Sequence, residues 1–278
     1  NMLMEHVFQC VDDIYDEVVN HGSDELKRTI CDLEKIAGHN TPSVIKKGIM
    51  LSMTICFNQV QFQDELFEGL LQENLEYMIR HIPEMKKTIQ LRVSLRGLEK
   101  EMNREIILPY FITLADLAYA VLAVFQAEGH HLFKIESDHG RFGCEQCDQE
   151  MLDDYAANVF LSDLHLEEGH QFSLWYDFGE DYVFDIQVLN IQTQSDLFVL
   201  EDSQITSGKG YGIWEDEHEL LEMYYKDYDE FLMRIEDYGL DEDDFIFDEF
   251  DKDIANEMLM EDFEFLRHVY EDQDEDLW

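Results

Sequence analysis

Residues 88–96 read Thr-Ile-Gln-Leu-Arg-Val-Ser-Leu-Arg, and this stretch decides the fold class. Its apolar residues alternate with polar ones, which is the period-two pattern of a β-strand with one face turned to solvent. Upstream, apolar residues recur at the three- to four-residue spacing of amphipathic helices, as at Leu26, Ile30 and Leu33. The change of period near Thr88 therefore predicts a helical N-terminal region followed by a domain that contains a sheet.

The pattern on either side of this strand predicts three regions. Residues 1–83 are expected to form a bundle of about four helices, interrupted near 58–63 and stopped by Pro83. Residues 84–227 are expected to form an α+β domain around a mostly antiparallel sheet. Its further strands are predicted at 104–108, 131–137, 171–176, 182–192 and 198–200, with a helix that begins after Thr113. Residues 228–278 are expected to form an acidic helical tail, part of which packs on the body.

The charge of the chain is strongly acidic and unevenly distributed. The chain has 64 acidic and 19 basic residues and a net charge of −45, of which residues 105–278, with 47 acids and 7 bases, contribute −40. This excess argues against direct binding to nucleic acid, which needs Lys and Arg to neutralise phosphates. The 45% hydrophobic content argues against a disordered acidic chain, and no apolar run is long enough to predict a membrane span. Three interpretations of the acidic charge stay open: it keeps the surface solvated, it attracts a basic protein partner, or it binds divalent cations.

Five cysteines offer one candidate metal site. Their odd number and the absence of a signal-peptide pattern at the N-terminus favour a reducing, cytoplasmic location. Cys144 and Cys147 form a Cys-x-x-Cys turn that can present two thiolates to a zinc ion, and His139 is a candidate third ligand. The alternative is a loop with two free thiols, and no cofactor is firmly predicted.

Several carboxylates are candidates for a second site. Asp177, Glu180 and Asp181 lie between two predicted strands, and Glu215 and Asp216 lie before a predicted helix. Convergent carboxylates can perform acid–base chemistry or hold magnesium. The alternative is that each acid has a local role, because Asp and Glu are favoured in hairpin turns and at helix N-termini.

An ordered set of motifs across the central region resembles a known family. It comprises the strand Ile89–Leu95 with Arg104, the piece Thr113-Leu-Ala-Asp-Leu117, the piece His131-Leu-Phe133, the stretch Tyr176-Asp-Phe-Gly-Glu-Asp181-Tyr182, and Gly208–Gly212 with Glu215-Asp216. Together these resemble the plasmid pRiA4b ORF-3-like proteins, also met as insertion-element passenger proteins labelled resolvase-like. The chain departs from the family pattern at Gln126-Ala127 and at Ile213-Trp214.

The resemblance implies a compact α+β domain and names no reaction. It makes a set of motif positions candidates for a functional surface, with no catalytic residue assigned among them: Arg104, His131, Tyr176, Asp177, Gly179, Asp181, Glu215 and Asp216. We expect Gly179 to adopt a positive φ in the tight turn between two strands. The function expected is that of a non-enzymatic cytoplasmic protein, an interaction module with an acidic surface. The alternatives are a metal-dependent hydrolase-type enzyme that uses the carboxylate cluster, and an acidic DNA mimic.

Overall fold

The computed structural model describes residues 2–57, 64–247 and 249–271, and the chain divides into two compact units. One is a helical unit of residues 1–86 with 194–197, and the other is a sheet unit of residues 87–193 with 198–278. Each unit has its own hydrophobic core. Among the described residues, no helix combines the length and the apolar character that crossing a membrane would require.

The helical unit contains four α-helices, as the periodicity predicted. They are α1 (Met2–His21), α2 (Asp24–Ala37), α3 (Thr41–Phe57) and α4 (Asp64–Met85), with the short 3₁₀ turn η1 (Gly38–Asn40) between α2 and α3. Ser23 caps α2 by accepting a hydrogen bond from the Leu26 N–H. The expected interruption at 58–63 lies outside the described residues. The expected stop at Pro83 is wrong, because α4 continues through this proline for two residues.

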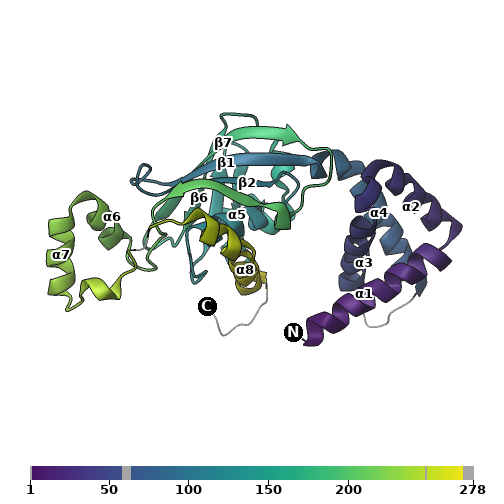
Figure 1. The fold of residues 1–278 in the computed structure, drawn as a ribbon, viewed down its shortest axis with the longest axis horizontal. Coiled ribbons are helices and arrows are strands. Elements are labelled where there is room, and N and C mark those ends of the chain that lie inside the picture. The colour runs from purple at the N-terminus through teal and green to yellow at the C-terminus, as the bar shows by residue number, and fades with distance from the viewer. Residues whose placement is uncertain (1, 58–63, 248, 272–278) are drawn as a thin grey trace. The chain divides into compact units, whose positions relative to one another are not determined.

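The sheet unit is built on eight strands in the order β5-β4-β3-β6-β7-β1-β2-β8. Figure 1 labels β1, β2, β6 and β7 of this sheet. All neighbours are antiparallel except β4 and β5. The strands are β1 (Lys87–Leu95), β2 (Asn103–Pro109), β3 (Phe133–Ser137), β4 (Gly140–Gly143), β5 (Asp154–Tyr155), β6 (Gln171–Tyr176), β7 (Tyr182–Thr193) and β8 (Gln204–Lys209). The α+β class and the mostly antiparallel sheet are therefore confirmed.

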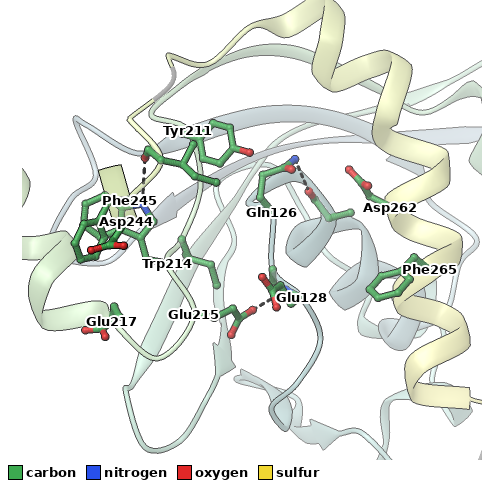
Figure 2. Close-up of a pocket in the computed structure, with 14 residues that line it drawn as sticks. Gln126, Glu128, Tyr211, Trp214, Glu215, Glu217, Asp244, Phe245, Asp262 and Phe265 are labelled. Atoms are coloured by element: carbon green, nitrogen blue, oxygen red, sulfur yellow. Dashed lines mark hydrogen bonds between the residues drawn. The ribbon is translucent and has the colours of Figure 1, made fainter. Parts of the chain in front are cut away.

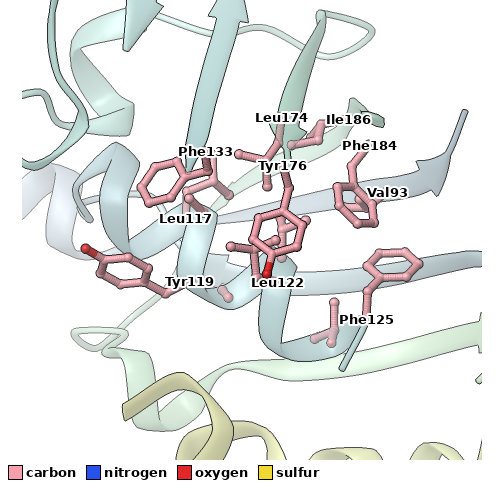
Figure 3. Close-up of a cluster of buried hydrophobic side chains, with 14 of the residues drawn as sticks. Val93, Leu117, Tyr119, Leu122, Phe125, Phe133, Leu174, Tyr176, Phe184 and Ile186 are labelled. Atoms are coloured by element: carbon pink, nitrogen blue, oxygen red, sulfur yellow. The ribbon is translucent and has the colours of Figure 1, made fainter. Parts of the chain in front are cut away.

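The alternating stretch forms β1, between β7 and β2. Its apolar residues are fully buried beneath the helix α5 (Leu114–Val124), whose start Thr113 caps by accepting a hydrogen bond from the Asp116 N–H. Figure 3 shows Leu117 and Leu122 of α5 among side chains from four strands of the sheet. The core under α5 includes Val93, Phe133, Leu174, Tyr176, Phe184 and Ile186.

The C-terminal segment contributes three helices: α6 (His218–Lys226), α7 (Tyr228–Asp237) and α8 (Lys252–Glu271). The last of these contacts α5 and β8 and buries Leu259, Phe263 and Leu266 in the core of the sheet unit. The helical tail is thus present, and apolar spacing within an acidic sequence correctly indicated that part of it packs on the body.

Several short strands differ from the expectation. Residues 198–200 are not a strand, and the chain enters the 3₁₀ turn η5 (Leu200–Asp202) instead. The strands β4, β5 and β8 were not predicted. Two of them contain glycines, and β5 has only two residues, so none carries an alternating apolar pattern.

Candidate functional site

The pairing of β3 with β6 brings the first two motif residues together. Phe133 lies opposite Tyr176 in this antiparallel pair, so the residues before β3 lie beside those after β6. The Asp177 N–H donates a hydrogen bond to the Leu132 carbonyl at 3.1 Å and fixes this corner. As a result the His131 Nε2 lies 3.6 Å from Asp177 Oδ2.

The segment before α6 brings two more motif residues to the same corner. Its path is fixed by the hydrogen bond from the Ile213 N–H to the Phe125 carbonyl and by the one from the Tyr182 hydroxyl to the Trp214 carbonyl. Glu215 Oε1 then accepts hydrogen bonds from the Glu128 N–H at 2.6 Å and from the Tyr176 hydroxyl at 2.8 Å. Tyr176 therefore orients this carboxylate.

Three carboxylates converge on one imidazole nitrogen. Besides Asp177, the His131 Nε2 faces Glu215 Oε2 at 3.6 Å and Asp216 Oδ1 at 3.0 Å. We call these four residues the histidine–carboxylate cluster. Asp177 and Glu215 are the buried members, with side chains 7% and 12% exposed, whereas the Asp216 side chain is 72% exposed. The cluster is closed by protein on one side and reachable from solvent on the other.

The buried polar atoms of the cluster lack hydrogen bonds. His131 Nε2, Asp177 Oδ2 and Glu215 Oε2 are all inaccessible to solvent and make none. The other oxygen of Asp177 accepts from the Gly179 and Glu180 N–H groups, so that only Oδ2 is left facing the histidine. Burial raises the pKa of Glu215, although its two donors and the nearby histidine act in the opposite direction.

The backbone of the cluster is held in a sparsely populated conformation. Asp177 has φ +54° and Asp216 has φ +59°, both in the left-handed region that aspartate tolerates better than most residues. Gly179, where we expected this conformation, does not have it, and Asp181 has it instead at φ +57°. Asp177 and Asp181 are the two ends of the connection between β6 and β7, residues 177–181. The Asp177 side chain closes this turn by accepting a hydrogen bond from the Gly179 N–H.

Two of the predicted carboxylates lie elsewhere. Glu180 Oε2 accepts a hydrogen bond from the His218 N–H at the start of α6, and Asp181 is exposed. These are the local roles that the alternative interpretation gave them, whereas Asp177, Glu215 and Asp216 converge.

Arg104 is not a surface residue, which corrects its place among the surface candidates. Its side chain is 1% exposed, and its guanidinium donates to five backbone carbonyls: those of Asn103, Val124, Lys209, Gly210 and Tyr211. The group also lies over the rings of Phe125 and Phe250, 4.9 and 4.1 Å from their centroids. Burial lowers its pKa to about 10. Arg104 therefore holds the loop after β8 against the end of α5.

The two thiols of the Cys-x-x-Cys turn lie together and are buried. The Sγ atoms of Cys144 and Cys147 are 3.4 Å apart, and the hydrogen bond between them lowers the pKa of Cys144 and raises that of Cys147. His139 is exposed on the turn between β3 and β4. In the described parts of the chain, only His131, Asp177 and Asp216 form a group of three or more possible metal ligands within 4.8 Å, so no third ligand accompanies the thiols.

A pocket of about 480 Å³ lies beside the cluster and shares Glu215 with it (Figure 2). Four segments of the sheet unit form it: the end of α5 with its following loop, the loop before α6, the residues around Phe245, and one face of α8. Most of the polar residues that line the pocket are acidic, and four aromatic residues line it as well. The acids are Glu128, Glu215, Glu217, Asp244 and Asp262, and the rings are Tyr211, Trp214, Phe245 and Phe265. Only Glu215 among these was a predicted site residue, because the four segments are far apart in sequence.

Fold and site together define an α+β domain that gathers His131, Tyr176, Asp177, Glu215 and Asp216 at one corner of a mostly antiparallel sheet. The family model of the plasmid pRiA4b ORF-3-like proteins matches residues 87–263, and the chain belongs to this family. A crystal structure of a protein of unknown function from Methanosarcina mazei Go1 is similar, with 23% identity and a TM-score of 0.47 over 60% of this chain and 95% of that one. No curated protein matches.

Proposed function

We propose that the sheet unit is an interaction module that binds a basic segment of a protein partner in the acidic pocket. The observation that carries this proposal is the lining of the pocket: five carboxylates and four aromatic rings, with no Lys, Arg or His among the described residues that form it. A cation that enters such a pocket gains both charge complementarity and contact with ring faces.

Two carboxylates of the pocket, Glu217 and Asp262, have pKa values raised by burial and by neighbouring acids. Burial raises the pKa of Glu217, and the neighbouring Glu180 and Asp216 raise it further. Burial and Glu261 likewise raise the pKa of Asp262. A raised carboxylate pKa means that the ionised form is unfavourable as the pocket stands, so that an entering ammonium or guanidinium group would relieve this repulsion.

The apolar lining suits the stem of a long basic side chain. Phe265 and Ile246 are 53% and 50% exposed at the pocket, and Trp214 supplies an indole whose N–H is already satisfied by the Ile246 carbonyl. Lys and Arg carry three or four methylene groups before the charge, and such stems pack on apolar surface while the head group meets a carboxylate. This favours a Lys- or Arg-bearing peptide over a small inorganic cation.

The test compares two carboxylate neutralisations that change the net charge equally. Binding of a Lys/Arg-rich peptide is measured by fluorescence anisotropy for the full chain, for Asp262→Asn in the pocket and for Glu236→Gln on the exposed surface of α7. We expect Asp262→Asn to weaken binding about fivefold to tenfold, about 1 kcal/mol for one charge-assisted contact, and Glu236→Gln to leave it within twofold.

Two further measurements separate binding in the pocket from attraction to the acidic surface as a whole. A peptide with norleucine in place of lysine is expected not to bind, and binding is expected to weaken between low and high salt because exposed charges are screened over about 8 Å at physiological ionic strength. Equal losses for Asp262→Asn and Glu236→Gln would show that a diffuse surface charge, not the pocket, attracts the peptide. If the chain binds a DNA-binding protein and duplex DNA competes with the chain for that protein, the DNA-mimic alternative is favoured instead.

A further inference from the structure

The histidine–carboxylate cluster contains polar atoms that the protein itself leaves unsatisfied. Asp177 is 5% exposed, and its Oδ2 points at His131 Nε2 without a hydrogen bond. Asp216 Oδ1 is within 3.0 Å of the same nitrogen, yet no hydrogen bond to the nitrogen forms. A buried polar atom without a partner is destabilising by about 1–3 kcal/mol, and here three such atoms, with Glu215 Oε2, face one point.

The spacing of these atoms is that of ligands around one small ion. With metal–ligand bonds of about 2.1 Å, neighbouring ligands lie about 3.0 Å apart in an octahedron and about 3.4 Å apart in a tetrahedron. The three oxygens lie 3.0, 3.6 and 3.6 Å from His131 Nε2. The possible ligand atoms of His131, Asp177 and Asp216 also lie within 4.8 Å of one another.

We propose that His131, Asp177 and Asp216 bind one divalent transition-metal ion, beside Glu215, whose Oε2 faces the same imidazole nitrogen. A neutral imidazole with its proton on Nδ1 presents a lone pair at Nε2, and the carboxylates supply the charge that balances the ion. One nitrogen with several oxygens suits Mn²⁺, Fe²⁺ or Zn²⁺ better than Ca²⁺, which takes oxygen ligands.

The surroundings of the cluster support an open site over a closed structural one. The Asp216 side chain is 72% exposed and that of His131 is 26% exposed, so water can reach the ion on that side. Tyr176 and the Glu128 N–H fix Glu215, and the Gly179 and Glu180 N–H groups fix Asp177. Ligand carboxylates that are held in this way by outer hydrogen bonds are typical of metal sites. An open site of this kind is also what the metal-dependent enzyme alternative requires.

Mn²⁺ is the best probe because it is paramagnetic and has low affinity for the thiolates of Cys144 and Cys147. The full chain, stripped with a chelator and dialysed, is titrated with MnCl₂ while electron paramagnetic resonance follows the free ion. We expect one saturable site per chain above the weak background of surface acids, with ¹⁴N coupling from one imidazole in the bound spectrum.

Two variants and a matched control test the ligand assignment. Asp177→Asn and His131→Gln are expected to weaken Mn²⁺ binding at least 100-fold, and His131→Gln is expected to abolish the ¹⁴N coupling. Asp181→Asn makes the same chemical change in the same turn, at an exposed aspartate with the same left-handed backbone, and is expected to alter affinity less than twofold. Because Asp216 is exposed, Asp216→Asn tests the site with little risk to folding, and we expect a tenfold loss.

The result that overturns the proposal is equally definite. Mn²⁺ binding that is only weak and unsaturable would show that the cluster does not hold the ion. Saturable binding would place the ion elsewhere if it gave no ¹⁴N coupling and if Asp177→Asn and Asp216→Asn left it unchanged. In that case the contacts between His131 and the carboxylates serve the fold of this corner alone. Because the peptide assay uses Glu236→Gln and Asp262→Asn, neither of which belongs to the cluster, failure of this proposal and failure of the interaction proposal are distinguishable.

Discussion

Replacing the buried Arg104 by lysine is expected to destabilise the sheet unit by about 4–5 kcal/mol. The guanidinium donates to five carbonyls, whereas a lysine ammonium has three N–H donors, so at least two carbonyls lose a charge-assisted hydrogen bond. At about 1.5 kcal/mol for each such bond, this loss amounts to about 3 kcal/mol. The planar contact with Phe125 and Phe250 is lost as well, which adds about 0.5–1 kcal/mol for each ring.

Tryptophan fluorescence isolates this effect from the helical unit. Residues 1–86 and 194–197 contain no tryptophan, and Trp175 and Trp214 lie in the sheet unit, so urea unfolding followed by the emission of these two residues reports on that unit. Arg92→Lys is the matched control: it makes the same change on β1 at a side chain that is 53% exposed and paired with Glu105, where we expect less than about 0.5 kcal/mol. A loss below about 1 kcal/mol for Arg104→Lys would show that the carbonyls are satisfied in other ways and would refute the reasoning.

Three further predictions concern other sites. Because burial raises the pKa of Asp262 above its ordinary 3.8, the ionised carboxylate lowers stability above that pH; Asp262→Asn should therefore raise the urea midpoint at pH 7, and this gain should shrink as the pH falls toward 4. Gly212→Ala should destabilise the sheet unit by about 1–3 kcal/mol, because the added Cβ would lie 2.5 Å from a backbone carbonyl oxygen at the end of α5. Gly179→Ala is the control: Gly179 has an ordinary φ, and the added Cβ would meet only a side-chain oxygen at 3.3 Å, so stability should change by less than about 1 kcal/mol. Because no third ligand lies beside Cys144 and Cys147 among the residues that the structure describes, protein purified without chelator should contain no zinc that depends on these two thiols. Metal analysis of the chain and of a Cys144→Ser, Cys147→Ser double variant checks this, and zinc that the double variant loses would revive the thiolate site.

Local sequence patterns predicted the strands and helices whose formation depends mainly on residues close together in the sequence. The alternation in 88–96 predicted β1, and Thr113 three residues before Asp116 correctly marked the start of α5. The strands β4 and β8 were not predicted because glycine weakens the strand signal, and they exist because neighbouring strands supply hydrogen-bond partners. The partner of β8 is β2, about 100 residues earlier, whereas β4 pairs with the adjacent β3; neither pairing leaves a periodic trace in the sequence.

The carboxylate pattern alone had suggested that Asp177, Glu215 and Asp216 converge, and the family motifs added His131. The resemblance selected four residues that the structure brings together, His131, Asp177, Glu215 and Asp216, although nothing local shows that they meet. The register between β3 and β6 brings His131 to Asp177, and register depends on the whole sheet. Hydrogen bonds of Ile213 and Trp214 to distant residues bring Glu215 and Asp216 to the same corner. The same motif set included Arg104 as a surface candidate, but its guanidinium is buried and donates to five backbone carbonyls.

Glu215 links the two proposed sites, and this link fixes how their ligands should affect one another. Its Oε2 faces His131, and the same residue lines the acidic pocket. An ion bound at the cluster would neutralise part of the negative charge that attracts a basic peptide, so each ligand should weaken the binding of the other. Linkage requires the two effects to be equal: the factor by which Mn²⁺ reduces peptide affinity is the factor by which the peptide reduces Mn²⁺ affinity. The coupling depends on charge near Glu215, and therefore the exposed Glu236 on α7 should not alter it.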